Sequence, residues 1–83
     1  MGDYRMNELK LKEMNAEKII YLYQPEGRGE YGEILYTFAD NATAVIKQAK
    51  EDEFGRYAHK AELKVKECVK RNNLPLKCIQ AWY

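Results

Sequence analysis

A glycine-rich segment carries the residue types and spacing that come closest to a known chemistry. Gly27, Gly29 and Gly32 have the G-x-G-x-x-G spacing of loops that cradle phosphates. In dinucleotide-binding proteins this loop opens a helix, whose N-terminus faces the pyrophosphate. Here strand-forming residues occupy 33–38, so the dinucleotide interpretation fails. We therefore predict that the glycines form the turn of a β-hairpin, where each is expected to allow a positive φ.

A longer stretch resembles the first three strands of a protein-kinase small lobe. Residues 27–34 match the kinase glycine-rich loop, and Ala44-Val45-Ile46-Lys47 stands where the third kinase strand carries its lysine. The resemblance implies that Lys47 would contact phosphate, with Glu62 or Glu67 as its helical partner. The chain lacks the His-Arg-Asp and Asp-Phe-Gly motifs that supply the kinase base and magnesium ligands. Nucleotide or phosphate binding at Gly27–Gly32 is therefore only a minor alternative.

Other residues suited to catalysis or metal binding are few. The chain contains no serine, which excludes serine nucleophiles. Cys68 and Cys78 lack C-x-x-C spacing and the chain has one histidine, so no metal site is expected. That histidine, His59, falls on the polar face of a predicted helix. We expect no catalytic residue, no metal and no cofactor, and we predict that the protein is not an enzyme.

A run of three carboxylates, Glu51-Asp52-Glu53, precedes the same helix. Consecutive side chains splay apart, so the run is a poor metal or acid–base pair. We predict instead that it stabilises the helix N-terminus, where negative charge is favoured by the macrodipole.

The first half of the chain predicts a hairpin. Residues 1–16 are polar and are expected to be flexible or weakly structured, at most a weak edge strand. Strands are predicted over 17–24 and 31–38. In the first strand Ile20 and Leu22 share one face. The opposite face carries Ile19, Tyr21 and Tyr23, and in the second strand Ile34, Tyr36 and Phe38 share a face.

The segment 42–48 fits two structures. As a helix it would be capped by Asp40 or Asn41. As a strand it would come after a tight turn at these two residues, because asparagine tolerates left-handed φ values. The run 43–46 is rich in β-branched residues, and the helical stripe does not continue in phase into the next segment of the chain. We therefore predict a strand.

An amphipathic helix over 54–71 is the clearest element. Its apolar stripe consists of Phe54, Tyr57, Ala58, Ala61, Val65, Cys68 and Val69. A last strand is predicted over 76–83, in which Ile79, Ala81 and Tyr83 alternate with Cys78, Gln80 and Trp82.

Together these elements predict a single α+β domain over 17–83. Its order is β-β-β-α-β: a small antiparallel meander, one main helix packed on one face, and a C-terminal strand, in two layers. The last strand is expected to run parallel to the 42–48 strand and could pair beside the 17–24 strand. Because one helix covers one face, we expect contacts with a partner or a second copy through an exposed sheet edge or the uncovered aromatic face.

Charge suggests two kinds of partner. The net charge is only +1, but acidic residues predominate over 1–53 and basic residues over 54–83. We predict a small non-catalytic protein-interaction module, either self-associating or binding another protein, and name nucleic-acid binding through the basic helix 54–71 as the alternative. The candidate contact residues are Lys60, Lys66, Lys70, Tyr21, Tyr23 and Trp82. No run of eighteen apolar residues and no secretory signal is present, so we expect a cytoplasmic protein that does not bind membranes.

The layout of four short motifs resembles small uncharacterised bacterial proteins. The motifs are Tyr23-x-Pro25-Glu26-Gly27, then Gly32-Glu33-Ile34, then Tyr57-Ala58-x-x-Ala61, and finally Ala81-Trp82-Tyr83. The resemblance spans 18–83. It implies a bacterial cytoplasmic origin and nothing about activity.

Overall fold

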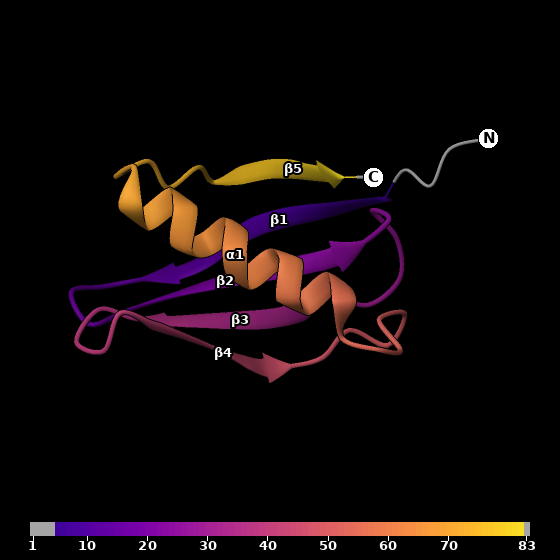
Figure 1. The fold of residues 1–83 in the computed structure, drawn as a ribbon, viewed down its shortest axis with the longest axis horizontal. Coiled ribbons are helices and arrows are strands. Elements are labelled where there is room, and N and C mark those ends of the chain that lie inside the picture. The colour runs from indigo at the N-terminus through magenta and orange to yellow at the C-terminus, as the bar shows by residue number, and fades with distance from the viewer. Residues whose placement is uncertain (1–4, 83) are drawn as a thin grey trace.

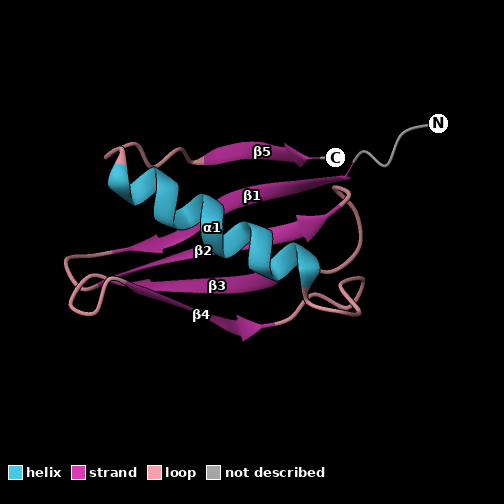
Figure 2. Cartoon of the chain, in the orientation of Figure 1, coloured by secondary structure: helices cyan, strands magenta, loops and turns pink. Residues whose placement is uncertain are grey.

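The structure is a computed structural model that describes residues 5–82 of the chain. Five antiparallel strands form one sheet in the order β4-β3-β2-β1-β5, and a helix crosses one face of it (Figure 1). The elements in chain order are β1 Arg5–Met14, β2 Lys18–Pro25, β3 Gly32–Thr37, β4 Ala42–Lys47, α1 Arg56–Lys70 and β5 Lys77–Trp82 (Figure 2). The prediction of a small two-layer α+β fold is confirmed.

Strand β1 lies in the segment for which the sequence predicts at most a weak edge strand. It is ten residues long and pairs with β2 on one side and β5 on the other. The expectation of a flexible or weakly structured segment is therefore wrong for residues 5–14; residues 1–4 lie outside the described part of the chain. The strand was missed because its buried face begins with a polar residue: Asn7 is fully buried beside Leu9.

The place of β5 depends on β1. We expected the last strand to pair beside the 17–24 strand, but β1 occupies that position and β5 pairs with β1 instead. Since β5 and β2 are both antiparallel to β1, and β4 runs in the direction of β2, β5 runs parallel to β4 as predicted. The two parallel strands lie at opposite edges of the sheet. Tyr83, predicted to end β5, lies outside the described residues.

The core lies between α1 and the sheet. The helix buries Ala58, Ala61, Val65 and Cys68. The sheet contributes Leu9, Ile19, Tyr21, Tyr23, Ile34 and Tyr36. The predicted stripe is wrong at Phe54, which is 79% exposed because the helix begins only at Arg56. The preceding Gly55 has a φ of 71°, and this left-handed turn directs Phe54 away from the core.

The segment 42–48 forms strand β4, as predicted. Asn41 has a φ of 51°, which confirms the tight turn before the strand. Strand β3 ends at Thr37, one residue short of the prediction, so Phe38 belongs to the turn. Its ring packs edge-on against Tyr36, with the centroids 5.3 Å apart, and the residue is 39% exposed.

The three glycines of the hairpin have different roles. Gly27 and Gly29 have φ values of 68° and 84°, as expected for the turn. Gly32 lies in β3 and has no positive φ, so the prediction is wrong there. A Cβ on Gly32 would lie 2.1 Å from Cε1 of Tyr23 and 2.8 Å from the backbone nitrogen of Ala49. Gly32 is needed because the Tyr23 ring occupies the space where a side chain would stand.

We predict that Gly32→Ala lowers the free energy of unfolding by about 3 kcal/mol or more, because the new methyl group overlaps both a buried ring and backbone. Denaturant titration measures the change. Gly55→Ala is the matched control: its Cβ meets nothing within 4 Å, so it carries only the strain of its left-handed φ, about 1 kcal/mol. Equal losses in the two variants would contradict the packing role of Gly32.

Candidate interaction surface

One carboxylate of the run before the helix, Asp52, binds the N-terminus of α1. Asp52 is 2% exposed, and its side chain accepts hydrogen bonds from the backbone N–H groups of Tyr57 and Ala58, at 3.1 Å and 2.9 Å. These are amides of the first helical turn, which have no partner within the helix. The predicted role at the helix N-terminus is thus confirmed for Asp52. Glu51 and Glu53 are exposed.

The tyrosines proposed as contact residues lie inside the protein. Tyr21 is 1% exposed and Tyr23 is fully buried, both on the side of the sheet covered by α1. The Tyr21 hydroxyl donates to the carbonyl oxygen of Pro75 at 2.6 Å. The Tyr23 hydroxyl donates to Asp52 at 3.0 Å and accepts from the Ala49 N–H at 2.9 Å. The uncovered face of the sheet is therefore not the aromatic one, and these two residues are not available to a partner.

Trp82, in contrast, stands at the end of β5 beside the helix. Its ring packs against Tyr57, with centroids 5.5 Å apart, and the Lys60 ammonium lies 5.5 Å from its centroid. Gln80 Nε2 donates to the carbonyl of Lys60 at 2.8 Å. The first half of α1 is thus fastened to β5 by both apolar and polar contacts.

An amide that the sequence analysis did not single out joins β1 to these elements. Asn7 Nδ2 donates to the carbonyl oxygen of Tyr57 at 3.0 Å and to Oε1 of Gln80 at 3.2 Å. Its Oδ1 is buried and has no hydrogen-bond partner within residues 5–82. The only sequence signal for this role is a polar residue in phase with Leu9, at a position that must be buried once β1 forms.

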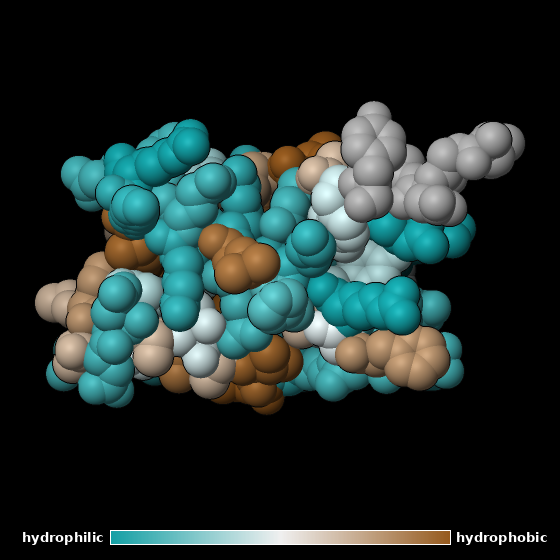
Figure 3. All heavy atoms as spheres, viewed as in Figure 1, coloured by the Kyte–Doolittle hydropathy of each residue, from teal (hydrophilic) through white to brown (hydrophobic). Residues whose placement is uncertain are grey.

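The predicted basic residues of α1 do not form one surface. Successive helical residues turn by about 100°, so Lys60 and Lys64 share one side while Lys66 and Lys70 share another, roughly 120° away. The first pair lies toward β5, as the contact between Lys60 and Trp82 shows. Lys66 and Lys70 are exposed to solvent. Figure 3 shows the resulting hydrophilic surface over α1.

The kinase-like arrangement is not assembled by this fold. Lys47 stands opposite Glu33 in the β3–β4 register, on the face away from the helix. Glu62 lies on the helix side, where it accepts a hydrogen bond from Thr43 at 2.9 Å. The sheet thus separates the lysine from its proposed partner. The Glu51 side chain also lies against Gly29, so a phosphate there would meet a carboxylate.

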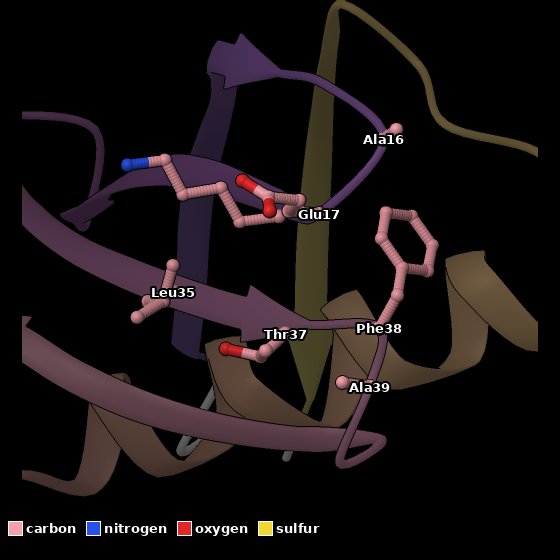
Figure 4. A pocket seen from close by; sticks show the side chains of 7 residues that line it. Ala16, Glu17, Leu35, Thr37, Phe38 and Ala39 are labelled. Carbon is pink, nitrogen blue, oxygen red and sulfur yellow. The ribbon is translucent and has the colours of Figure 1, made fainter.

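The open face of the sheet carries Ile20, Leu22 and Leu35. Ile20 is only 7% exposed, because charged side chains spread over this face. They form ion pairs between Lys12 and Glu33 at 3.0 Å, and between Lys18 and Glu13 at 3.6 Å. A hollow of about 610 Å³ lies at one end of this face, between the β1–β2 and β3–β4 turns (Figure 4). Its lining is Ala16, Glu17, Lys18, Leu35, Thr37, Phe38 and Ala39.

The sheet has two edges, and they differ. On β4 the register shifts near its end, which leaves Ile46 as a bulge, and Val45 and Ile46 are 40% and 49% exposed. Strand β5 pairs with β1 over six residues without a shift. The N–H of Leu11 donates to the carbonyl of Leu76 at 2.9 Å. Backbone groups alternate along a strand, so those of Cys78, Gln80 and Trp82 face β1 and those of Lys77, Ile79 and Ala81 point outward.

Three tyrosine phenols and two cysteine thiols have raised pKa values. Burial raises the pKa of Tyr21, Tyr23 and Tyr57 to about 12. For Tyr57 the hydrogen bond to Glu26, at 2.6 Å, adds to this effect on the pKa. Burial also raises the pKa of the thiols of Cys68 and Cys78, both free. Protonated thiols are poor nucleophiles, so neither cysteine is poised for covalent chemistry.

Comparison with known protein families, curated proteins and solved structures finds no match. The resemblance to small bacterial proteins therefore stays a prediction. Across residues 5–82, the structure contains no helix of the length and apolar character needed to span a bilayer. In the same residues, no three or more His, Cys, Asp or Glu side chains are placed so that they could hold a metal ion together.

We predict that the protein loses stability as pH rises from about 10 to about 12. The phenols of Tyr21, Tyr23 and Tyr57 have a folded pKa of about 12 against an ordinary value of 10.0. In this window the unfolded chain binds fewer protons than the folded one, so stability falls with pH. Tyrosinate absorbance, followed with circular dichroism, should show these phenols ionising only as the fold is lost. Complete ionisation near pH 10 with the fold intact would contradict their burial.

We predict that Asp52→Ala lowers the free energy of unfolding by about 2–3 kcal/mol, because it leaves two helix amides and a buried hydroxyl without an acceptor. Thermal and denaturant unfolding measure the loss. Glu53→Ala removes a neighbouring exposed carboxylate and should cost less than about 0.5 kcal/mol. Similar losses in the two variants would show that general charge near the helix matters, and not the hydrogen bonds of Asp52.

Proposed function

We propose that the protein is a small non-catalytic protein-interaction module that binds an extended segment of a partner along strand β5. One observation carries the proposal: the outer edge of β5 presents the backbone groups of Lys77, Ile79 and Ala81 in a regular, unshifted strand. A segment added there would form main-chain hydrogen bonds with them. Such strand addition draws affinity from the backbone and specificity from alternate side chains.

The contrast between the two edges supports the choice of β5. Natural edge strands are protected by bulges, prolines or charges that prevent pairing with another chain. Strand β4 carries a bulge at Ile46. Strand β5 has neither bulge nor proline; its one charged residue, Lys77, stands at its start, and the Ile79 side chain is 59% exposed. An exposed isoleucine beside a regular edge offers a partner both backbone and apolar contacts.

The reactive side chains support a role without catalysis. Asp52 caps the helix, and the phenols of Tyr21 and Tyr23 are buried hydrogen-bond donors. Burial of Cys68 and partial burial of Cys78 raise the pKa of these two free thiols. Free thiols also suit a reducing compartment, in keeping with a bacterial cytoplasm as the proposed location.

A proline at the outward edge tests the proposal. Ala81 is exposed and its N–H points away from β1, so Ala81→Pro should remove one donor for an added strand while keeping the sheet. Val45→Pro is the matched control on β4. The bond from the Phe38 N–H to the Glu17 carbonyl shows that Phe38 and, by alternation, Tyr36 direct their N–H groups to β2. Leu35 therefore faces Ala44 in β4, and the N–H of Val45 points outward.

We expect proteins captured from an extract of the source cells by the immobilised wild type to be retained by Val45→Pro and lost by Ala81→Pro. Mass spectrometry of the eluates and thermal unfolding of each variant are the measurements. Unchanged capture by folded Ala81→Pro would overturn the proposal. Loss with Val45→Pro alone would place the interaction at β4, and sedimentation would show whether it joins two copies of the chain.

A further inference from the structure

Resting on the proposed function, we propose that the segment bound along β5 is acidic, with carboxylates alternating with aliphatic side chains. The geometry behind this is a set of lysines that borders β5 on both faces of the sheet. Lys77 and Lys10 lie on the open face, and Lys60 and Lys64 lie on the helix side.

On the open face two lysines stand directly opposite each other. Lys77 pairs with Lys10 in the β1–β5 register, and like charges in such positions repel. Within residues 5–82 neither forms an ion pair; the Lys10 ammonium lies 5.4 Å from the ring centroid of Tyr31. Glu8, opposite Ile79, lies on the same face two residues from Lys10. A carboxylate on an added strand next to Lys77 would relieve the repulsion.

On the helix side the two lysines run beside β5 along its length. Lys60 lies over Trp82, and its carbonyl receives the hydrogen bond from Gln80. Lys64 is one turn further along α1; burial raises the pKa of the Cys78 thiol, and the Lys64 ammonium is near enough to oppose that shift. Glu67 pairs with Lys64 at 3.3 Å. Lys60 has no carboxylate partner among the described residues; its ammonium lies over the Trp82 ring, 5.5 Å from the centroid.

These positions define the pattern of the bound segment. Side chains of a strand alternate between faces, so carboxylates directed to the helix side would meet Lys60 and Lys64 while aliphatic residues pack on Ile79 and Ala81. A segment shifted by one residue would direct its carboxylates to the open face, toward Lys10 and Lys77. A second copy of β5 fits poorly, because its only charged residue is Lys77 and it brings no carboxylate to these lysines. Charge complementarity therefore selects an acidic partner.

Three peptides test the inference on the full chain. The acidic probe is acetyl-Glu-Val-Glu-Val-Glu-Val-Glu-amide; in the neutral and basic probes glutamine or lysine replaces glutamate. We expect the acidic peptide to bind about tenfold more tightly than the neutral one, with an advantage that falls as salt rises, and the basic peptide not to bind. Amide resonances of Lys77, Ile79 and Ala81 should move during the titration.

A charge exchange locates the effect. The double variant Lys60→Glu with Lys77→Glu should prefer the basic peptide. Lys66→Glu with Lys70→Glu changes the net charge equally on the other side of the helix and should keep the acidic preference. Retention of the acidic preference after the first exchange would overturn the inference.

The remaining outcomes separate this inference from the proposed function. Equal binding of the acidic and neutral peptides, abolished by Ala81→Pro, would keep strand addition and overturn the charge preference. Failure of the acidic peptide to shift the β5 amides at millimolar concentration would overturn the inference, while the capture experiment still decides the function. A single-stranded oligonucleotide that displaces the acidic peptide from β5 would overturn it in favour of nucleic acid.

Discussion

The fold depends on where the Tyr23 side chain lies. Its ring fills the space above Gly32 in the neighbouring strand, and its hydroxyl connects Asp52 to the backbone of Ala49. Asp52 in turn holds the first amides of α1. One buried side chain therefore joins β2, β3, the connection after β4 and the helix N-terminus. The position of α1 over the sheet is set by this junction.

Much of the fold could be predicted from local patterns. The alternation in 17–24 and the helical stripe of Ala58, Ala61 and Val65 are strong because they are formed by apolar residues, and the structure confirms both. Strand β1 could not be predicted in this way. Its polar Asn7 is buried only because Tyr57 and Gln80, distant in the chain, supply partners for its amide. A long-range hydrogen bond of this kind leaves no periodic signal.

The candidate surface was predicted less well, and for a related reason. Tyr21 and Tyr23 were chosen because aromatic residues favour contacts, but the side of a strand that a helix covers is set by packing. Trp82 and Lys60 are accessible enough to contribute, and the structure brings them together where α1 passes β5. The outer edge of β5 is regular because β5 pairs with β1. This edge could not be predicted from a sequence pattern that does not predict β1 as a paired strand.

The pairing of β1 with β5 has a kinetic consequence. Asn7 and Gln80 are 73 positions apart, yet their strands are neighbours in the sheet. Closing so long a loop is entropically costly, so this ladder is expected to form late in folding and to be among the first to open. Strand β5 would then visit a detached state more often than the hairpin of β2 and β3 does. Any substitution that holds β1 and β5 together would therefore raise the affinity of the segment that we propose to bind along β5.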